Sequence, residues 1–262
     1  MEETLGEIEF LALSPNRVTV LESLADGARS RSELAAATGA SQATLGRILG
    51  DFEDREWVER APGGYAATAT GRLVAEGFRD LLDVMAAERE LRDVVAYLPT
   101  EAMDFDLRNL AEATIVTPTE TRPNAPLQRL LDLMREADYV TAFSHALNDQ
   151  SLSVVADRLG AQEFEAVLTR DAVQSLTADT GLSARLRTVL DAESAGVRAY
   201  DGEIPLAVTI ADDVVNILVR DARGVVQASV DTANAAVREW AERRYEHYRA
   251  QSDPLTPADL DE

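Results

Sequence analysis

The sequence of 262 residues contains no cysteine, no lysine and only two histidines. Without cysteine, neither a disulfide nor a thiolate metal site can form. Without lysine, the phosphate-binding P-loop of nucleotide-hydrolysing enzymes is excluded, because its motif requires that residue. No apolar run approaches the ~20 residues that a membrane helix needs. Together with an acidic amino terminus, these absences predict a cytoplasmic protein.

The charge of the chain is strongly negative. Its formal net charge is −22, because 47 Asp and Glu residues oppose 25 basic residues, all of which are Arg. Self-repulsion of this size destabilises a compact chain in dilute buffer, whereas halophiles use it for solubility in concentrated salt. We therefore expect a protein from a salt-rich cell. A GC-rich mesophile is the alternative, and it explains Arg in place of Lys but less readily the size of the charge.

Residues 30–52 have the pattern of two short helices joined by a tight turn. Ser30 and Glu33 form a capping box, Gly39 supplies the left-handed residue that ends the first helix, and Ser41 caps the second. The second helix carries one apolar stripe at helical spacing, consisting of Leu45, Ile48, Leu49 and Phe52. Small Ala35 allows the two helices to cross closely. The pattern is typical of a helix-turn-helix, with an ordinary helical hairpin as the alternative.

A short hairpin is predicted directly after these helices. Residues 57–70 place β-forming residues on both sides of the Pro62-Gly63-Gly64 turn. A hairpin in this position is typical of winged helix-turn-helix domains, in which the wing lies along the DNA backbone. Within residues 40–50, Arg47 is the only charged residue, whereas acidic residues resume at Asp51. This patch without acids favours DNA binding.

The candidate DNA-binding residues lie on or near the second helix. Gln42 and Arg47 are expected to read base edges, since Gln pairs with adenine and Arg with guanine. The other candidates are expected to hold phosphates: Arg31, Ser41, Thr44 and, from the wing, Arg60. The alternative for each is an exposed side chain with no ligand.

The remaining chain divides into a helical stretch, a mixed domain and a tail. Residues 1–70 are expected to form the winged domain and residues 71–99 a linker and dimerisation helix, kinked or split near Glu88. Packing of that helix on its own chain is the alternative. From residue 104 to residue 250, strands first alternate with helices, as in mainly parallel sheets, and the last three are joined by connections of hairpin length. We therefore expect an α/β domain with a mixed sheet and an antiparallel meander at one edge. The fold class is α+β or α/β, and residues 251–262 are expected to be a mobile acidic tail.

A ligand site is expected where strands of this sheet end. His145 follows the strand 139–143 and would lie outside its carboxyl end, where open α/β sheets bind ligands. The candidate ligand-binding residues are Ser144, His145, Thr169, Arg170, Tyr200 and Asp201. Arg170 suggests an anionic metabolite, because its planar fork matches phosphate and carboxylate oxygens. A salt bridge to an acid such as Asp171 is the alternative.

No catalytic machinery is evident. No convergent acid, base and nucleophile occurs, and His145 beside Ser144 lacks the carboxylate that orients a triad. Metal-ligand spacing of His, Asp and Glu is also absent. We therefore expect a binding protein without a metal or a cofactor, and an enzyme acting on a small molecule is the less favoured reading.

Two segments resemble known regulators. Residues 8–27 (IEFLALSPNRVTVLESLADG) and 31–60, within a close match over residues 7–72, resemble the winged helix-turn-helix regulators of haloarchaea. Residues 139–148 (YVTAFSHALN) and 236–249 (AVREWAERRYEHYR) resemble the sensor domain attached to them. That domain is similar to the one in the methanogen filamentation regulator and, more distantly, in the sugar-sensing TrmB-type regulators with a phospholipase-D-like fold.

The resemblance implies a homodimeric transcription factor of a halophilic archaeon. It would bind a semi-palindromic double-stranded DNA operator and respond to a small effector of carbon or energy metabolism held in the second domain. A ligand-free oligomerisation or protein-interaction module is the alternative for that domain. Many relatives have Gly where this chain has Glu56. Active phospholipase-D enzymes need a His-x-Lys-x4-Asp motif, which a chain without Lys cannot supply.

Overall fold

The structure is a computed structural model that describes residues 1–260. The chain separates into two compact units, residues 1–85 and residues 86–262. The expected fold class is confirmed: the first unit is a winged helix-turn-helix and the second is a mixed α/β domain. No helix among residues 1–260 combines the length and the apolar character that crossing a membrane demands.

The N-terminal unit follows the local signals of the sequence. Its elements are α1 (Glu2–Ala12), α2 (Pro15–Ala25), α3 (Arg31–Thr38), α4 (Gln42–Glu53), β1 (Val58–Ala61), β2 (Gly64–Ala67) and the first part of α5 (Ala69–Leu91). The capping box of Ser30 and Glu33 is present, and Gly39 ends α3 with φ 68°. The Ser41 hydroxyl accepts a hydrogen bond from the Thr44 amide at 3.2 Å and so caps α4.

The core of this unit is built on the apolar stripe of α4. Leu45, Ile48, Leu49 and Phe52 are at most 1% exposed, as expected from their spacing. Phe52 also packs against Trp57, with ring centroids 5.9 Å apart, and against Phe10 at 6.1 Å. These contacts fix which side of α4 faces the core and therefore which side faces solvent.

The wing is joined to the helices through a third extended segment. Arg29 and Tyr65 exchange two backbone hydrogen bonds of 2.9 Å, so the chain before α3 pairs with β2. The backbones approach closely at Gly64, where a Cβ would lie 2.1 Å from the carbonyl oxygen of Arg29. Only glycine fits there, because any side chain would clash with that backbone.

Glu56 occupies a backbone conformation that favours glycine. Its φ of 57° lies in the left-handed region, which glycine enters without a Cβ clash and other residues rarely adopt. Its carbonyl oxygen accepts hydrogen bonds from the hydroxyls of Thr68, at 2.7 Å, and Thr70, at 3.2 Å. The two threonines tie this strained connection to the end of the wing.

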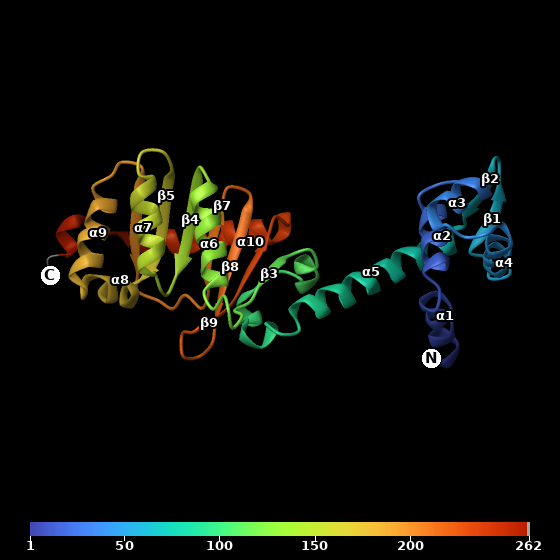
Figure 1. The fold of residues 1–262 in the computed structure, drawn as a ribbon, viewed down its shortest axis with the longest axis horizontal. Helices are drawn as coiled ribbons and strands as arrows, with labels where there is room; N and C mark the ends of the chain where they lie inside the picture. The colour runs from blue at the N-terminus through green and yellow to red at the C-terminus, as the bar shows by residue number, and fades with distance from the viewer. Residues whose placement is uncertain (261–262) are drawn as a thin grey trace. The chain divides into compact units, whose positions relative to one another are not determined.

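The C-terminal unit is a sheet covered by helices on both faces (Figure 1). Its strands lie in the order β10-β6-β5-β4-β7-β8-β9-β3. The strand bounds are β3 (Thr114–Val116), β4 (Tyr139–Ser144), β5 (Glu163–Thr169), β6 (Ala195–Tyr200), β7 (Ala207–Ala211), β8 (Val214–Arg220), β9 (Val226–Thr232) and β10 (Ser252–Pro254). The α-helices are α6 (Ala125–Glu136), α7 (Asp149–Arg158), α8 (Arg170–Thr177), α9 (Thr180–Leu190) and α10 (Ala235–Ala250), and short 3-10 turns cover residues 95–97, 100–102, 107–110 and 257–260.

Parallel pairing is confined to the three strands β4, β5 and β6. All other neighbours, including β4 with β7, are antiparallel. The expected mixed sheet with an antiparallel meander is therefore confirmed, and its parallel part is limited to three of the eight strands. The sequence shows that helices separate the earlier strands, but not that β7 returns alongside β4.

The two faces of the sheet have separate cores. Helices α6 to α9 pack on one face, while α10 packs on the other with Trp240 buried at its centre. Trp240 contacts Phe105 and Phe143, at centroid distances of 5.0 and 6.3 Å. Leu91 and Leu98 are buried in this second core. The second half of the expected linker 71–99 therefore packs into the C-terminal unit, and α5 ends at Leu91 rather than continuing to residue 99.

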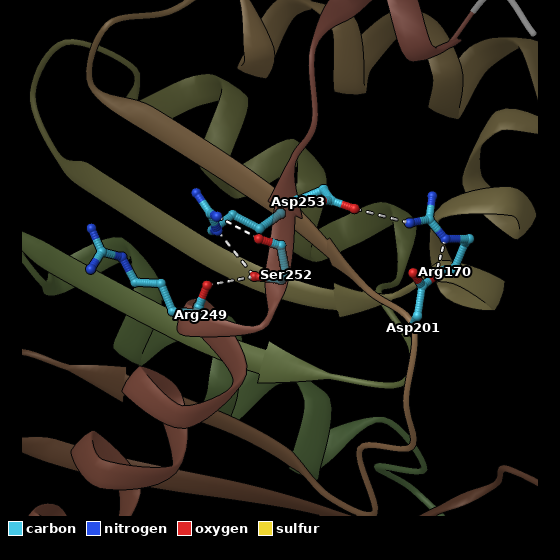
Figure 2. Close-up of polar contacts among 6 residues, drawn as sticks. Arg170, Asp201, Arg249, Ser252 and Asp253 are labelled. Carbon is cyan, nitrogen blue, oxygen red and sulfur yellow. Dashed lines mark hydrogen bonds and ion pairs between the residues drawn. The ribbon is translucent and has the colours of Figure 1, made fainter.

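The C-terminal segment is part of the sheet. Strand β10 pairs antiparallel with β6, and the Ser252 hydroxyl accepts a hydrogen bond from Arg198 Nε and donates one to the Arg249 carbonyl, both at 3.0 Å (Figure 2). Of the residues expected to form a mobile tail, 252–254 form this strand and 257–260 a 3-10 turn. Residues 261–262 lie outside the described residues. A short acidic strand rich in proline carries no apolar alternation by which it could be recognised.

The start of α5 offers a test of the packing of the winged unit. A Cβ on Gly71 would lie 1.9 Å from the carbonyl oxygen of Trp57. Gly71→Ala should therefore destabilise this unit by about 1–3 kcal/mol through overpacking. Gly77→Ala is the control in the same helix, because a Cβ there meets nothing within 4 Å. It should stabilise the helix by up to about 1 kcal/mol. Calorimetry of the full chain measures both, and similar effects would contradict the close approach at Gly71.

Candidate functional site

The first candidate site is the outward side of α4. Gln42 and Arg47 are exposed and form no hydrogen bond or ion pair with residues 1–260. The hydroxyls of Ser41 and Thr44 lie 3.0 Å apart at the start of the helix, where Ser41 also serves as the cap. No acidic side chain belongs to the first two turns of α4, so this end of the helix presents amides, hydroxyls and one guanidinium.

Two of the expected phosphate contacts meet at the wing. Arg31, the first residue of α3, donates from Nη2 to the Tyr65 hydroxyl at 3.3 Å, and its guanidinium carbon lies 5.7 Å from the ring centroid. Arg60 on β1 lies 5.2 Å from the same centroid. Arg60 also pairs with Glu53 at 3.3 Å while remaining largely exposed. The guanidinium groups of Arg31 and Arg60 thus both lie near the Tyr65 ring, beside α4.

The second candidate site is a cavity of about 310 Å³ in the C-terminal unit. Five of the six expected ligand residues line it together: His145, Thr169, Arg170, Tyr200 and Asp201. They come from the ends of β4, β5 and β6, as the parallel pairing of these strands requires. The segment 202–205 and Asp171 complete the wall.

Ser144 does not line the cavity. It is buried, and its hydroxyl forms hydrogen bonds with the amide and the carbonyl of Ala146, which shape the turn after β4. The Thr169 hydroxyl lines the cavity and also accepts a hydrogen bond from the Ala172 amide at 3.3 Å. Thr169 therefore begins α8, a helix that the sequence analysis did not predict.

Arg170 is neutralised within the protein. It forms ion pairs with Asp201 and, at 3.5 Å, with Asp253 of β10 (Figure 2). The Arg170 hydrogen bond lowers the pKa of Asp201 and the Asp201 carboxylate raises the pKa of Arg170. The salt-bridge alternative is thus realised, although with partners 31 and 83 residues away instead of Asp171.

His145 has a cationic neighbour that the sequence analysis missed. Burial and, after it, the charge of Arg220 lower the pKa of His145, while a hydrogen bond with the backbone of Ile204 acts in the opposite direction. Burial also lowers the pKa of Arg220 itself. The sequence feature that could have identified this neighbour is its position: Arg220 directly follows the apolar run 214–219. The guanidinium of an arginine at the end of a buried strand is not fully solvated.

A separate polar cluster is buried between α6 and the sheet. Asn216 Nδ2 donates to Ser229 Oγ at 2.5 Å and to Asp231 Oδ1 at 3.2 Å. Arg129 donates to Asp231 Oδ2 at 2.7 Å. These side chains form most of their hydrogen bonds with one another and cross-link β8, β9 and α6. We therefore assign the cluster a structural role. Among residues 1–260, no group of His, Asp and Glu has an arrangement that could hold a metal ion.

The Arg170 ion pair can be tested through the titration of its partner. Removing the guanidinium in Arg170→Met should raise the pKa of Asp201 towards the ordinary value of a carboxyl, because the hydrogen bond to Arg170 is the main cause of its lowering. Carboxyl-carbon NMR titration, assigned with Asp201→Asn, measures this. Arg185→Met, which breaks an ion pair with Asp149, is the control. An unchanged Asp201 in Arg170→Met would show that Arg170 is not its partner in solution.

Known proteins are similar to both units. Residues 5–90 match the family model described as the HVO_A0261 N-terminal domain. Residues 123–251 match the model described as the middle domain of the methanogenesis regulatory protein FilR1. No curated protein sequence matches the chain.

Three solved structures show distant similarity. TrmBL2, an archaeal chromatin protein, is 15% identical over 95% of this chain and 98% of its own, with a TM-score of 0.39. The phospholipase D family member Nuc from Salmonella typhimurium is 11% identical over 55% of this chain and 99% of its own, with a TM-score of 0.41. NucT from Helicobacter pylori is 9% identical over 55% and 98%, with a TM-score of 0.39.

The identities and TM-scores of these solved structures are too low to support a functional argument. Residues 5–90 are thus similar to the HVO_A0261 N-terminal domain and residues 123–251 to the FilR1 middle domain.

Proposed function

We propose that the chain is a DNA-binding transcription regulator of a salt-rich archaeal cell. It binds a semi-palindromic operator as a homodimer and responds to a small metabolite held by the C-terminal unit. The observation that carries the proposal is the outward side of α4, where Gln42 and Arg47 are exposed and unpaired within the described chain while the opposite side is buried. The description of FilR1 as a regulatory protein supports the same function.

The charge of the protein determines how this helix binds DNA. Phosphate attraction depends on released counterions and weakens as salt rises. A chain of net charge −22 gains little from that term. We therefore assign most of the operator affinity to hydrogen bonds from Gln42 and Arg47 to base edges, with Arg31, Ser41, Thr44 and Arg60 fixing the position of the helix on the backbone.

The contribution of Arg47 is the direct test of DNA binding. Arg47→Ala should weaken operator binding by roughly 1–3 kcal/mol and relax selectivity at one base pair, as expected for a bidentate contact to guanine. Fluorescence anisotropy with operator and scrambled DNA, in molar salt, measures both effects.

Arg243→Ala, which removes the same charge from the exposed surface of α10, is the control and should bind like the parent protein. Operator affinity that stays unchanged in Arg47→Ala would remove this residue from the interface.

Helix α5 provides a surface for a second copy of the chain. Its stripe begins with buried Ala75 and Phe78 on the winged unit, and it continues into Leu81, Leu82 and Met85. These last three are 39%, 44% and 54% exposed. Spacing of three and four residues places all of them on one side of the helix, as in helices that associate in pairs. A homodimer through α5 would bury this stripe and place two copies of α4 on one operator.

The dimer is tested by placing a charge in the stripe. Leu82→Asp should shift the protein towards a monomer, because association would bury an unpaired carboxylate. Size-exclusion chromatography with light scattering reports the mass. Leu73→Asp is the matched control: Leu73 is 69% exposed and lies on the opposite side of α5, so this variant should remain dimeric. Equal masses for both variants would exclude α5 as the dimer interface.

The cavity beside His145 supports an effector rather than the alternative of a ligand-free interaction module. Its volume of about 310 Å³ suits a small metabolite, and polar side chains from three strand ends converge on it. A module that serves only assembly has no need of such a convergence.

A further inference from the structure

Arg220 is a partly buried cation without an acidic partner. Nη1 donates to the carbonyl of Gly224 at 3.0 Å. Nε is buried and has no hydrogen-bonding partner. No ion pair joins Arg220 to a carboxylate among residues 1–260, although acidic residues greatly outnumber basic ones. An unpaired, half-desolvated charge is costly, so a group that neutralises it would be bound favourably.

The sheet places Arg220 at the same edge as the cavity. Strand β7 pairs antiparallel with both β4 and β8, with Val208 opposite Phe143 and Ala207 opposite Leu218. Two residues beyond these pairs, β4 leads into His145 and β8 ends at Arg220. The intervening segment that leads into β7 includes Ile204 and Pro205, which line the cavity with His145.

The strand pairing is irregular at Arg220. The pairing of β8 with β9 shifts register between Val219 and Arg220. Such a bulge re-aims the side chain that follows it and is frequent next to binding sites. The charge of Arg220 also reaches His145, whose pKa it lowers. Arg220 does not itself line the cavity, but it ends the strand at the same edge of the sheet and its charge acts on His145, which does line it.

The other charges around the cavity do not compete for an anion. Arg170 is already held by Asp201 and Asp253. The remaining charged groups in the wall, Asp171 and Glu203, are acidic and repel an anion. Arg170 thus has carboxylate partners, whereas Arg220 has none among residues 1–260.

We propose that Arg220, together with His145, binds the oxyanion of a small metabolite, a phosphate or a carboxylate, in the cavity of the C-terminal unit. The inference rests on the proposed role of this unit in ligand binding and assigns the chemical class of the ligand. The sequence suggested Arg170 as the residue that binds the anion, whereas the structure favours Arg220, whose guanidinium has no carboxylate partner. Arg220 supplies charge and donors, and the His145 ring supplies a second polar contact.

The two histidines allow a direct measurement on the full chain. His145 lines the cavity, whereas His247 lies exposed on α10 near Gln251 and serves as an internal reference. The ring-carbon resonances of labelled histidine are followed while inorganic phosphate, or separately succinate, replaces NaCl at constant ionic strength. The His145 signal should shift and saturate, while the His247 signal should not. The two titrations distinguish phosphate from carboxylate as the preferred oxyanion.

Variants separate anion binding from a structural role. Arg220→Met should weaken binding of the preferred anion at least tenfold, while its thermal midpoint without anion should equal or exceed that of the parent. Arg220→Lys, which retains a charge but not the planar fork, should fold and bind several-fold more weakly than the parent. Arg223→Met removes an exposed arginine that pairs with Asp221, and it is the control that should bind like the parent.

Two outcomes would overturn the inference. One is an Arg220→Met protein that binds phosphate and succinate as tightly as the parent. The other is the absence of any saturable His145 shift with either anion. Neither outcome bears on operator binding, which is measured separately with Arg47→Ala, so a failure of this inference is distinguishable from a failure of the proposed function.

Discussion

The ion pairing in this protein is governed by the excess of acidic over basic residues. With 47 acidic and 25 basic residues, most arginines are held by carboxylates, as Arg170 is by Asp201 and Asp253. An arginine without such a partner is therefore informative. Arg47 on α4 and Arg220 at the end of β8 are two of these among residues 1–260, and they lie at the two candidate sites.

The features that sequence reasoning identified depend on near neighbours in the chain. The capping box at Ser30, the turn at Gly39 and the apolar stripe of α4 are each encoded within a few residues, and all three are present. The convergence of His145, Thr169 and Tyr200 was also predictable, because parallel strands place their carboxyl ends at one edge. The winged fold and most of the ligand cavity could thus be read from local pattern and strand order.

The features that sequence reasoning missed depend on distant pairs. Whether Arg170 is free or neutralised is decided by Asp201 and Asp253, 31 and 83 residues away. Strand β10 has too few apolar residues to show a pattern, and its place is set by the exposed edge of β6. Arg220 looked like an ordinary strand end, and only the fold shows that it lacks a carboxylate and lies near His145. Local periodicity carries no information about such pairings.

The bridge between Arg29 and Tyr65 makes the winged unit mechanically continuous. The wing shares backbone hydrogen bonds with the segment that leads into α3, and the hydroxyls of Thr68 and Thr70 hold the connection that leaves α4. These hydrogen bonds join the wing to the segments before α3 and after α4. In the dimeric regulator proposed above, an effector would therefore act on the spacing or the pairing of two intact winged units and not on the geometry inside one of them.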